Sequence, residues 1–371
     1  MKVLIIVPDY PNKNKISYQF VHERVKKYLS HFDVQVFILN KEAEDYTYEN
    51  VKVISGDTKK LKSLINDYDK FVFHFLNNKS AYFILKYLKN KNVYIWFHGS
   101  DCVSYKRRLD RINYSKKKLL NPKMFLKTMA FIIFNKIKFF NISSINKNCN
   151  VTFIFVSNWN KDASEKDIKI KYKKYQIIPN YIDSTKFKYY QKSADQRFKV
   201  LSINNYANNI YAGDMTQDII YNFSKEKEFE KFEFLIYGTG RLFNEYTKKI
   251  KDFKNVKIEN RILNHDEIAH VQKNYGIFLY PKRGDSQGVS RCEAMSSGLV
   301  PIASDVEAIS EFSPQETTYL VKSVTDFIRV LKNIVYDEKD FLRKSKQAAI
   351  FINEKCSYEN TIKKEIDLLG E

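Results

Sequence analysis

One segment in the second half of the chain combines residues that suit the binding of a phosphorylated ligand. Tyr280–Ser304 (YPKRGDSQGVSRCEAMSSGLVPIAS) predicts a strand, a polar loop, a helix that begins near Gly288, and a second strand. The first turn of a helix has free N–H groups and the positive end of the helix dipole, so it binds phosphate readily. Gly288 leaves room for close approach, and the amides of Val289 and Ser290 are candidates to hold a diphosphate.

Two carboxylates flank this predicted helix start. Asp285 lies in the loop before it, and Glu293 lies about a turn and a half into the helix. Carboxylate oxygens accept hydrogen bonds from hydroxyls, so one suits a sugar and the other a ribose diol. Lys282 and Arg283 add positive charge beside them. Single carboxylates in such places are usually solvated or capping residues, but the glycine and the strand–helix context favour ligand binding here.

Short apolar runs alternate with helical patterns along the whole chain, and these must position the residues above. Runs of this kind, rich in Val, Ile and Phe, are typical of parallel strands buried on both faces, and strand–helix alternation predicts doubly wound α/β units. The runs are Val3–Val7, Val34–Leu39, Val51–Ile54, Phe71–Phe75, Val93–Phe97 and Val151–Val156, and then Phe198–Ile203, Phe232–Tyr237, Val256–Glu259, Phe278–Tyr280 and Val300–Ala303.

The alternation occurs twice, which predicts two domains. The polar stretch Tyr189–Gln196 precedes a new first strand, so we expect domains at 1–193 and 194–350, followed by a C-terminal segment 351–371 that crosses back to the first domain. Ligands of such sheets bind outside the carboxyl ends of the strands. Of ten glycines, seven lie between Gly213 and Gly298, which indicates that the second domain holds the bound group.

Four motifs in this order resemble those of retaining glycosyltransferases of family 4, which have the GT-B fold of two facing Rossmann-like domains. The resemblance rests on His98–Asp101 (HGSD), on Val156-Ser157 followed by Ile178–Asp183 (IPNYID), on the stretch FLIYGTGR that ends at Arg241, and on an acid-x7-acid segment. The residues that carry this last segment are Asp285, Gly288, Glu293, Ala294, Met295, Gly298 and Pro301.

The resemblance implies a role for each matching position. It implies that Glu293 binds the ribose of a nucleotide, that Asp285 binds the transferred sugar, and that Gly288, Val289 and Ser290 bind the diphosphate by their backbone. His98 and Asp101 are expected to contact the sugar and the acceptor, which makes His98, Asp101 and Asp285 the expected catalytic residues. In such enzymes the leaving diphosphate helps to deprotonate the acceptor, so the resemblance implies retention of configuration with no metal ion or other cofactor. The implied donor is a nucleoside-diphosphate sugar, with UDP favoured over GDP.

One departure concerns the charge that faces the diphosphate. Members of the family usually carry an Arg and a Lys after the first strand of the second domain, whereas here that place is taken by NNYANNIYAGD (204–214). Arg241, Arg283 and Lys282 are candidates to replace this charge. The first acid of the motif is Asp285 rather than the usual Glu.

The chain is strongly basic, with 63 Lys and Arg against 43 Asp and Glu and a net charge of +20. Much of the excess lies between Tyr105 and Asn150, where basic residues greatly outnumber the single acid Asp110. Within it, Met124–Phe140 has apolar residues at helical spacing with lysines between them. This pattern suggests an anionic membrane surface as a partner of 105–140, and the alternative is a helix that packs on the core with a charged back. No nucleic-acid recognition motif accompanies the charge, so nucleic acid is not an expected partner.

Cysteine spacing and hydropathy narrow the setting further. The four cysteines form no CxxC pair, so neither a disulfide scaffold nor a zinc site is predicted. No apolar run has the length of a signal-peptide core or a membrane span, so we expect a cytoplasmic protein, peripheral on the inner membrane face. The expected activity is retaining transfer of a sugar to a hydroxyl of a saccharide or lipid-linked saccharide, in the assembly of a cell-surface polysaccharide or glycan. Two alternatives stay open, namely a nucleotide-sugar epimerase or phosphorylase, and a non-catalytic binding module.

Overall fold

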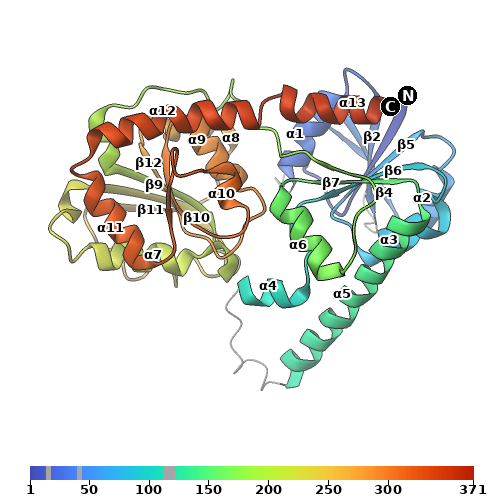
Figure 1. Cartoon of the computed structure of the whole chain (residues 1–371), viewed down its shortest axis with the longest axis horizontal. Helices are drawn as coiled ribbons and strands as arrows, with labels where there is room; N and C mark the ends of the chain where they lie inside the picture. The colour runs from blue at the N-terminus through green and yellow to red at the C-terminus, as the bar shows by residue number, and fades with distance from the viewer. Residues whose placement is uncertain (14–17, 40–43, 112–121) are drawn as a thin grey trace. The chain divides into compact units, whose positions relative to one another are not determined.

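The computed structural model describes residues 1–13, 18–39, 44–111 and 122–371, of which 110–111 and 122–124 are described as backbone only. The chain forms two compact units. The first holds most of Met1–Asn180 together with Thr361–Glu371, and the second holds Tyr181–Asn360. Each unit has one sheet with helices on both faces (Figure 1). All four cysteines are free thiols.

The first unit has an eight-stranded sheet in the order β3-β4-β2-β1-β5-β6-β7-β8, parallel except for β3. Its strands are β1 (Lys2–Val7), β2 (Asp33–Leu39), β3 (Tyr46–Tyr48), β4 (Val51–Gly56), β5 (Lys70–His74), β6 (Asn92–Phe97), β7 (Val151–Phe155) and β8 (Tyr175–Ile177). Its helices are α1 (Gln19–Tyr28), α2 (Thr58–Ser63), α3 (Asn78–Tyr87), α4 (Tyr105–Arg111), α5 (Pro122–Asn148), α6 (Asn158–Ile168) and α13 (Lys364–Gly370).

The second unit has a six-stranded, wholly parallel sheet in the order β11-β10-β9-β12-β13-β14. Its strands are β9 (Lys199–Asn205), β10 (Glu233–Thr239), β11 (Val256–Asn260), β12 (Ile277–Tyr280), β13 (Val300–Ser304) and β14 (Tyr319–Val321). Its α-helices are α7 (Gly213–Phe223), α8 (His265–Gln272), α9 (Val289–Ser296), α10 (Ile309–Phe312), α11 (Val324–Ile334) and α12 (Glu338–Lys355).

Strand residues are buried on both faces of each sheet, as the apolar runs predict. Along β1, Leu4 and Ile6 pack with α3 and α5 on one face, while Val3 and Ile5 pack with α1 and α13 on the other. This alternation follows from the two-residue repeat of a strand. Every run predicted as a strand forms one, and the predicted doubly wound α/β fold is confirmed.

Strand order reverses direction between β1 and β5 in the first sheet and between β9 and β12 in the second. Such a switch point leaves a crevice at the carboxyl ends of the two strands, where ligands of this fold class bind. Among the described residues, no helix is long and apolar enough to cross a membrane.

Candidate functional site

The switch point of the second sheet lies beside the start of α9. β9 and β12 pair in parallel, so the loops that follow Asn205 and Tyr280 leave the same edge of the sheet. Gly288 is the N-cap of α9 in the left-handed region, with φ 81° and ψ 61°, and no side chain caps this helix end. The amides of Val289 and Ser290 therefore begin the helix as free donors typical of an anion site.

Polar groups crowd closely around Gly288. A Cβ added to Gly288 would lie 3.2 Å from Asp285 Oδ2, from the Tyr280 hydroxyl and from Arg291 Cζ. The Tyr280 hydroxyl donates to Asp285 Oδ2 at 2.5 Å, and the amide of Gln287 donates to Asp285 Oδ1 at 3.2 Å. Asp285 is thus oriented within the loop that the sequence singled out, next to the free helix end.

Glu293 lies on α9 and is buried. Burial raises the pKa of its carboxyl to about 8, the neighbouring Cys292 adds to the rise, and Lys186 opposes it. His265, at the start of α8, places Nε2 3.8 Å from Glu293 Oε1. The sequence predicts Glu293 as a ligand but gives no sign of His265, because the two residues are distant in the sequence and come together only in the folded chain.

The predicted donor residues Arg241 and Arg283 both bond to the loop after β9. Arg283 forms a two-pronged ion pair with Asp214, with N–O distances of 2.8 and 2.6 Å, and Nη1 also donates to the carbonyl of Asn209. Arg241 is exposed and its Nε donates to the carbonyl of Ala207. Both guanidinium groups fix this loop in the described structure.

Two further cations lie at this edge of the sheet, namely Lys282, which the sequence offers as a candidate to replace the missing charge, and Arg291, which the sequence does not single out. Lys282 is buried, and its Nζ donates to Asn204 Oδ1 at 2.6 Å. Arg291 is fully buried on the first turn of α9. The one sequence signal for Arg291 is its position three residues after Gly288, in a short helix whose other charged residue is Glu293.

In the first unit, the loop after β6 holds His98 and Asp101. The Asp101 carboxylate accepts hydrogen bonds from the amides of His98 and Gly99 at 2.9 to 3.3 Å, so it closes its own loop. Burial raises the pKa of Asp101 to about 6. His98 Nε2 lies 2.9 Å from His74 Nδ1, and burial lowers the pKa of both imidazoles well below the usual range, which makes both neutral at pH 7.

A hollow of about 270 Å³ adjoins this loop in the first unit. Aromatic, amide and charged side chains line it, among them Asp101, Arg108, Phe131, Phe134, Asn135 and Lys138. Aromatic faces beside amide and charged groups are the usual lining of a small-molecule site. Lys138 is buried and its Nζ donates to the backbone carbonyl of Asp101 at 2.6 Å, which ties α5 to the loop.

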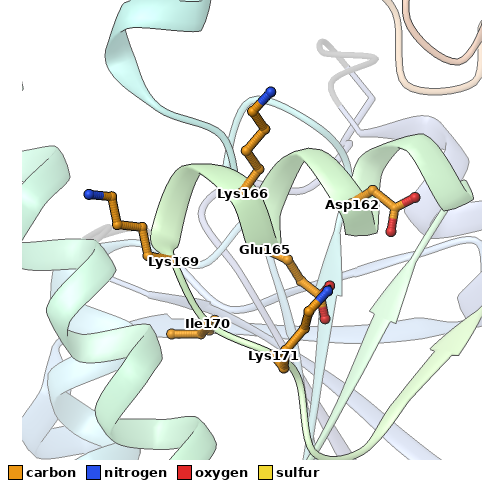
Figure 2. Close-up of a pocket in the computed structure, with 6 residues that line it drawn as sticks. All are labelled: Asp162, Glu165, Lys166, Lys169, Ile170 and Lys171. Carbon is orange, nitrogen blue, oxygen red and sulfur yellow. The ribbon is translucent and has the colours of Figure 1, made fainter.

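A second hollow, of about 560 Å³, lies at the end of α6. Figure 2 shows that Lys166 and Lys169 point away from each other there, while Glu165 meets Lys171 in an ion pair of 2.7 Å. Glu165 also accepts from the amide of Tyr172. Glu165 is thus satisfied by its neighbours and the two lysines diverge, so this hollow offers no convergent set of groups for catalysis.

Comparison with known proteins matches part of the second unit to a family model. Residues 197–337 match the family model described as glycosyl transferases group 1. Among curated proteins no sequence match reaches significance.

Solved structures share the fold over nearly the whole chain. Sucrose-phosphate synthase from Thermosynechococcus elongatus matches with a TM-score of 0.71 at 12% identity, covering 99% of this chain and 98% of that chain. HepE from Anabaena, in complex with UDP and glucose, matches with a TM-score of 0.70 at 11% identity, covering 100% of both chains. WaaG, a glycosyltransferase involved in lipopolysaccharide biosynthesis, matches with a TM-score of 0.67 at 12% identity, covering 99% of both chains.

These structures have the GT-B fold, and the predicted GT-B fold is confirmed. Together with the family match in the second unit, the comparisons support a glycosyltransferase.

Proposed function

We propose that the chain transfers a sugar, with retention of configuration, from a nucleoside-diphosphate sugar to a hydroxyl of a saccharide or lipid-linked saccharide. The observation that carries this proposal is the uncapped start of α9, where Gly288 has a left-handed conformation, the carboxyl group of Asp285 lies close to it, and Glu293 follows on the same helix. UDP is the nucleotide we favour, and UDP-glucose is the first donor to test, because structural neighbours were solved with UDP, glucose and UDP-glucose.

Each part of the site has a step in the proposed reaction. The amides of Val289 and Ser290 bind the diphosphate, Glu293 binds the ribose diol and Asp285 orients the transferred sugar. The bond between the sugar and the diphosphate oxygen breaks, a bond to the acceptor hydroxyl forms on the same face, and the hydroxyl proton passes to the leaving diphosphate. Charge develops on the diphosphate in this step, so fixed donors at the helix start stabilise it. We propose that no metal ion takes part.

The acceptor, in this proposal, enters the hollow beside the loop of His98 and Asp101. Phe131 and Phe134 offer aromatic faces for a sugar ring, and Asn135 offers an amide. The neutral imidazole of His98 suits contact with hydroxyl groups, because it carries both a donor and an acceptor nitrogen.

A test of the proposal measures UDP release from a panel of UDP-sugars and GDP-sugars in the presence of EDTA, with and without saccharide acceptors. Acceptor-dependent release with one donor, together with an NMR signal for the unchanged anomeric configuration, supports it. Change of the donor sugar without acceptor indicates an epimerase, and turnover that needs free phosphate indicates a phosphorylase. Nucleotide binding without turnover under any of these conditions indicates a binding module.

We also propose that 105–140 rests on an anionic membrane surface at the cytoplasmic face. The N-terminal half of α5 projects beyond the sheet of its unit (Figure 1) and exposes many large apolar side chains. These are Phe125, Leu126, Met129, Phe131, Ile133, Phe134, Ile137 and Phe140. At about 100° per residue, all but Phe131 lie on one half of the helix circumference, while Ile142 and Ile145, which pack in the core, lie on the other half. An apolar helix face that stays exposed in this way marks an interaction site.

Charge favours anionic lipid as the partner of this face. Lys127 and Lys136 on α5 and Arg108 on α4 are exposed and have no acidic partner among the described residues. The further basic positions 111, 116–118 and 123 lie outside the described side chains. Flotation with vesicles of phosphatidylglycerol and of phosphatidylcholine tests the proposal. Binding to phosphatidylglycerol vesicles alone supports the proposal if the double variant Phe134→Ser/Phe140→Ser loses this binding and the control Ile350→Ser on α12 keeps it. Equal flotation of all variants refutes the proposal.

A further inference from the structure

The guanidinium of Arg291 lies close to the start of α9 and forms no ion pair with an acidic side chain of the described residues. The side chain is fully buried, its Nη2 donates to the carbonyl of Gln287 at 2.6 Å, and the group lies 5.4 Å from the ring centroid of Tyr280. Nε and Nη1 have no hydrogen-bond partner, and no ion pair to Arg291 is found among the described residues. A buried charge without an ion pair of its own is unfavourable, so a ligand that supplies negative charge would bind here with advantage.

A second cation reaches the same edge of the sheet from the loop after β12. Lys282 Nζ donates to Asn204 Oδ1 and lies 4.7 Å from the ring centroids of Tyr211 and Tyr280. The loop that follows β9, from Asn204 to Gly213, contains no Lys or Arg. Lys282 therefore brings to the end of β9 a positive charge that this loop does not carry.

These groups gather around Asp285 at the start of α9. Arg291 Cζ and Asp285 Oδ2 are each 3.2 Å from the point that a Cβ of Gly288 would occupy, and Lys282 interacts electrostatically with both. Two cations thus face one carboxylate, at a helix end that no side chain caps. The excess of positive charge and the free amides point to the same ligand chemistry, which is a group with at least two negative charges.

We propose that Arg291 and Lys282 are the counter-charges of the donor diphosphate, in place of basic residues on the loop after β9. This inference rests on the proposed donor site. The amides of Val289 and Ser290 bind the phosphate oxygens, while the positive charges of Arg291 and Lys282 neutralise the negative charge of the diphosphate. Because negative charge on the diphosphate increases as the sugar departs, the same two groups also favour the transfer step.

Calorimetric binding of UDP, UMP and uridine to the full-length protein tests this assignment. The variants are Arg291→Met, Arg291→Lys and Lys282→Met, with Arg343→Met as a matched control, since Arg343 lies on the surface of α12 and pairs with Asp340. We expect Arg291→Met and Lys282→Met to weaken UDP tenfold or more, with a smaller effect on UMP and uridine affinity unchanged. Arg291→Lys retains part of the UDP affinity, and the control binds all three ligands as the unaltered protein does.

The stability of the ligand-free protein gives an independent readout. Removal of an uncompensated buried charge is neutral or stabilising, so ligand-free Arg291→Met is expected to melt at or above the temperature of the unaltered protein. Unchanged UDP affinity in both Met variants, or equal weakening of UDP and uridine, overturns the assignment while leaving the donor site in place. If the unaltered protein binds no nucleotide at all, the proposed function fails first. If Arg291→Met does not fold, the UDP affinities of Lys282→Met and Arg291→Lys test the assignment.

Discussion

Glu293 is predicted to make the stability of the protein depend strongly on pH. Burial raises the pKa of this carboxyl from 4.5 to about 8, so the folded protein holds it protonated at neutral pH. The unfolded chain releases that proton near pH 4.5. The favourable contribution is therefore fully present below pH 4.5 and is lost as the pH rises through 8.

The size of the effect follows from the two pKa values. Each unit of difference corresponds to about 1.4 kcal/mol, and integration between pH 5 and pH 8 gives at most about 3 to 4 kcal/mol of lost stability. For a unit of this size, that amounts to a fall in melting temperature of roughly 6 to 14 °C. The variant Glu293→Gln cannot ionise, so this component is absent from it.

Thermal unfolding of the unaltered protein and of Glu293→Gln from pH 5 to pH 9 measures the component directly. The difference in melting temperature between the two is expected to grow in favour of Glu293→Gln as the pH rises to 8. Glu316→Gln, at an exposed position, serves as the control and should follow the unaltered protein. Curves for Glu293→Gln and the unaltered protein that stay parallel across this range would refute the reasoning.

Three further predictions concern other parts of the structure. Glu365 forms an ion pair of 2.8 Å with the buried Arg24, and Glu365→Ala leaves that guanidinium without a counter-charge, so urea unfolding should show a loss of about 3 to 5 kcal/mol. Arg283→Met removes the two-pronged ion pair to Asp214, so the loop after β9 loosens and the KM for the donor is expected to rise several-fold with little change in melting temperature. Asp101→Ala removes the acceptor for two amides of its own loop, so turnover is expected to fall at least tenfold while UDP affinity, measured by calorimetry, stays unchanged.

The strands of this fold could be predicted because both faces of each sheet are buried. A strand in that setting is a continuous apolar run, and β1, β6 and β12 are all of this kind. The short strands β3, β8 and β14 were not predicted, since they lie at the edges of their sheets and most of their residues are half-buried or exposed. Edge strands need less apolar burial, so their sequences do not differ clearly from loops.

The site was predictable where one local segment carries it and not where distant segments meet. Gly288, Asp285 and Glu293 lie within nine residues, and a strand–glycine–helix pattern places them together. By contrast, Arg283 binds Asp214 across the fold, and this partner cannot be found from spacing. Burial of Arg291 depends on what packs over α9.

The helical pattern of α5 also did not predict which of its apolar side chains are exposed. The sequence suggests one apolar stripe with lysines between, whereas the structure exposes one apolar face and buries another. Ile142 and Ile145 pack in the core, and Phe134 and Phe140 are exposed. Periodicity identifies a helix with apolar faces but does not say which face the protein itself covers.

The ionisable groups around α9 together explain why this unit should be stabilised unusually by its ligand. Glu293, Lys282 and Arg291 are all buried within or beside one short helix, and burial raises the pKa of Glu293 and lowers that of Lys282 to about 8. Each group opposes folding in the ligand-free protein. A diphosphate offers a counter-charge to the two cations, and a ribose diol offers hydrogen bonds to the carboxylate. The same ligand therefore relieves all three groups. We expect UDP to bind this site more tightly than it would bind an uncharged site of equal size, and to raise the melting temperature correspondingly more.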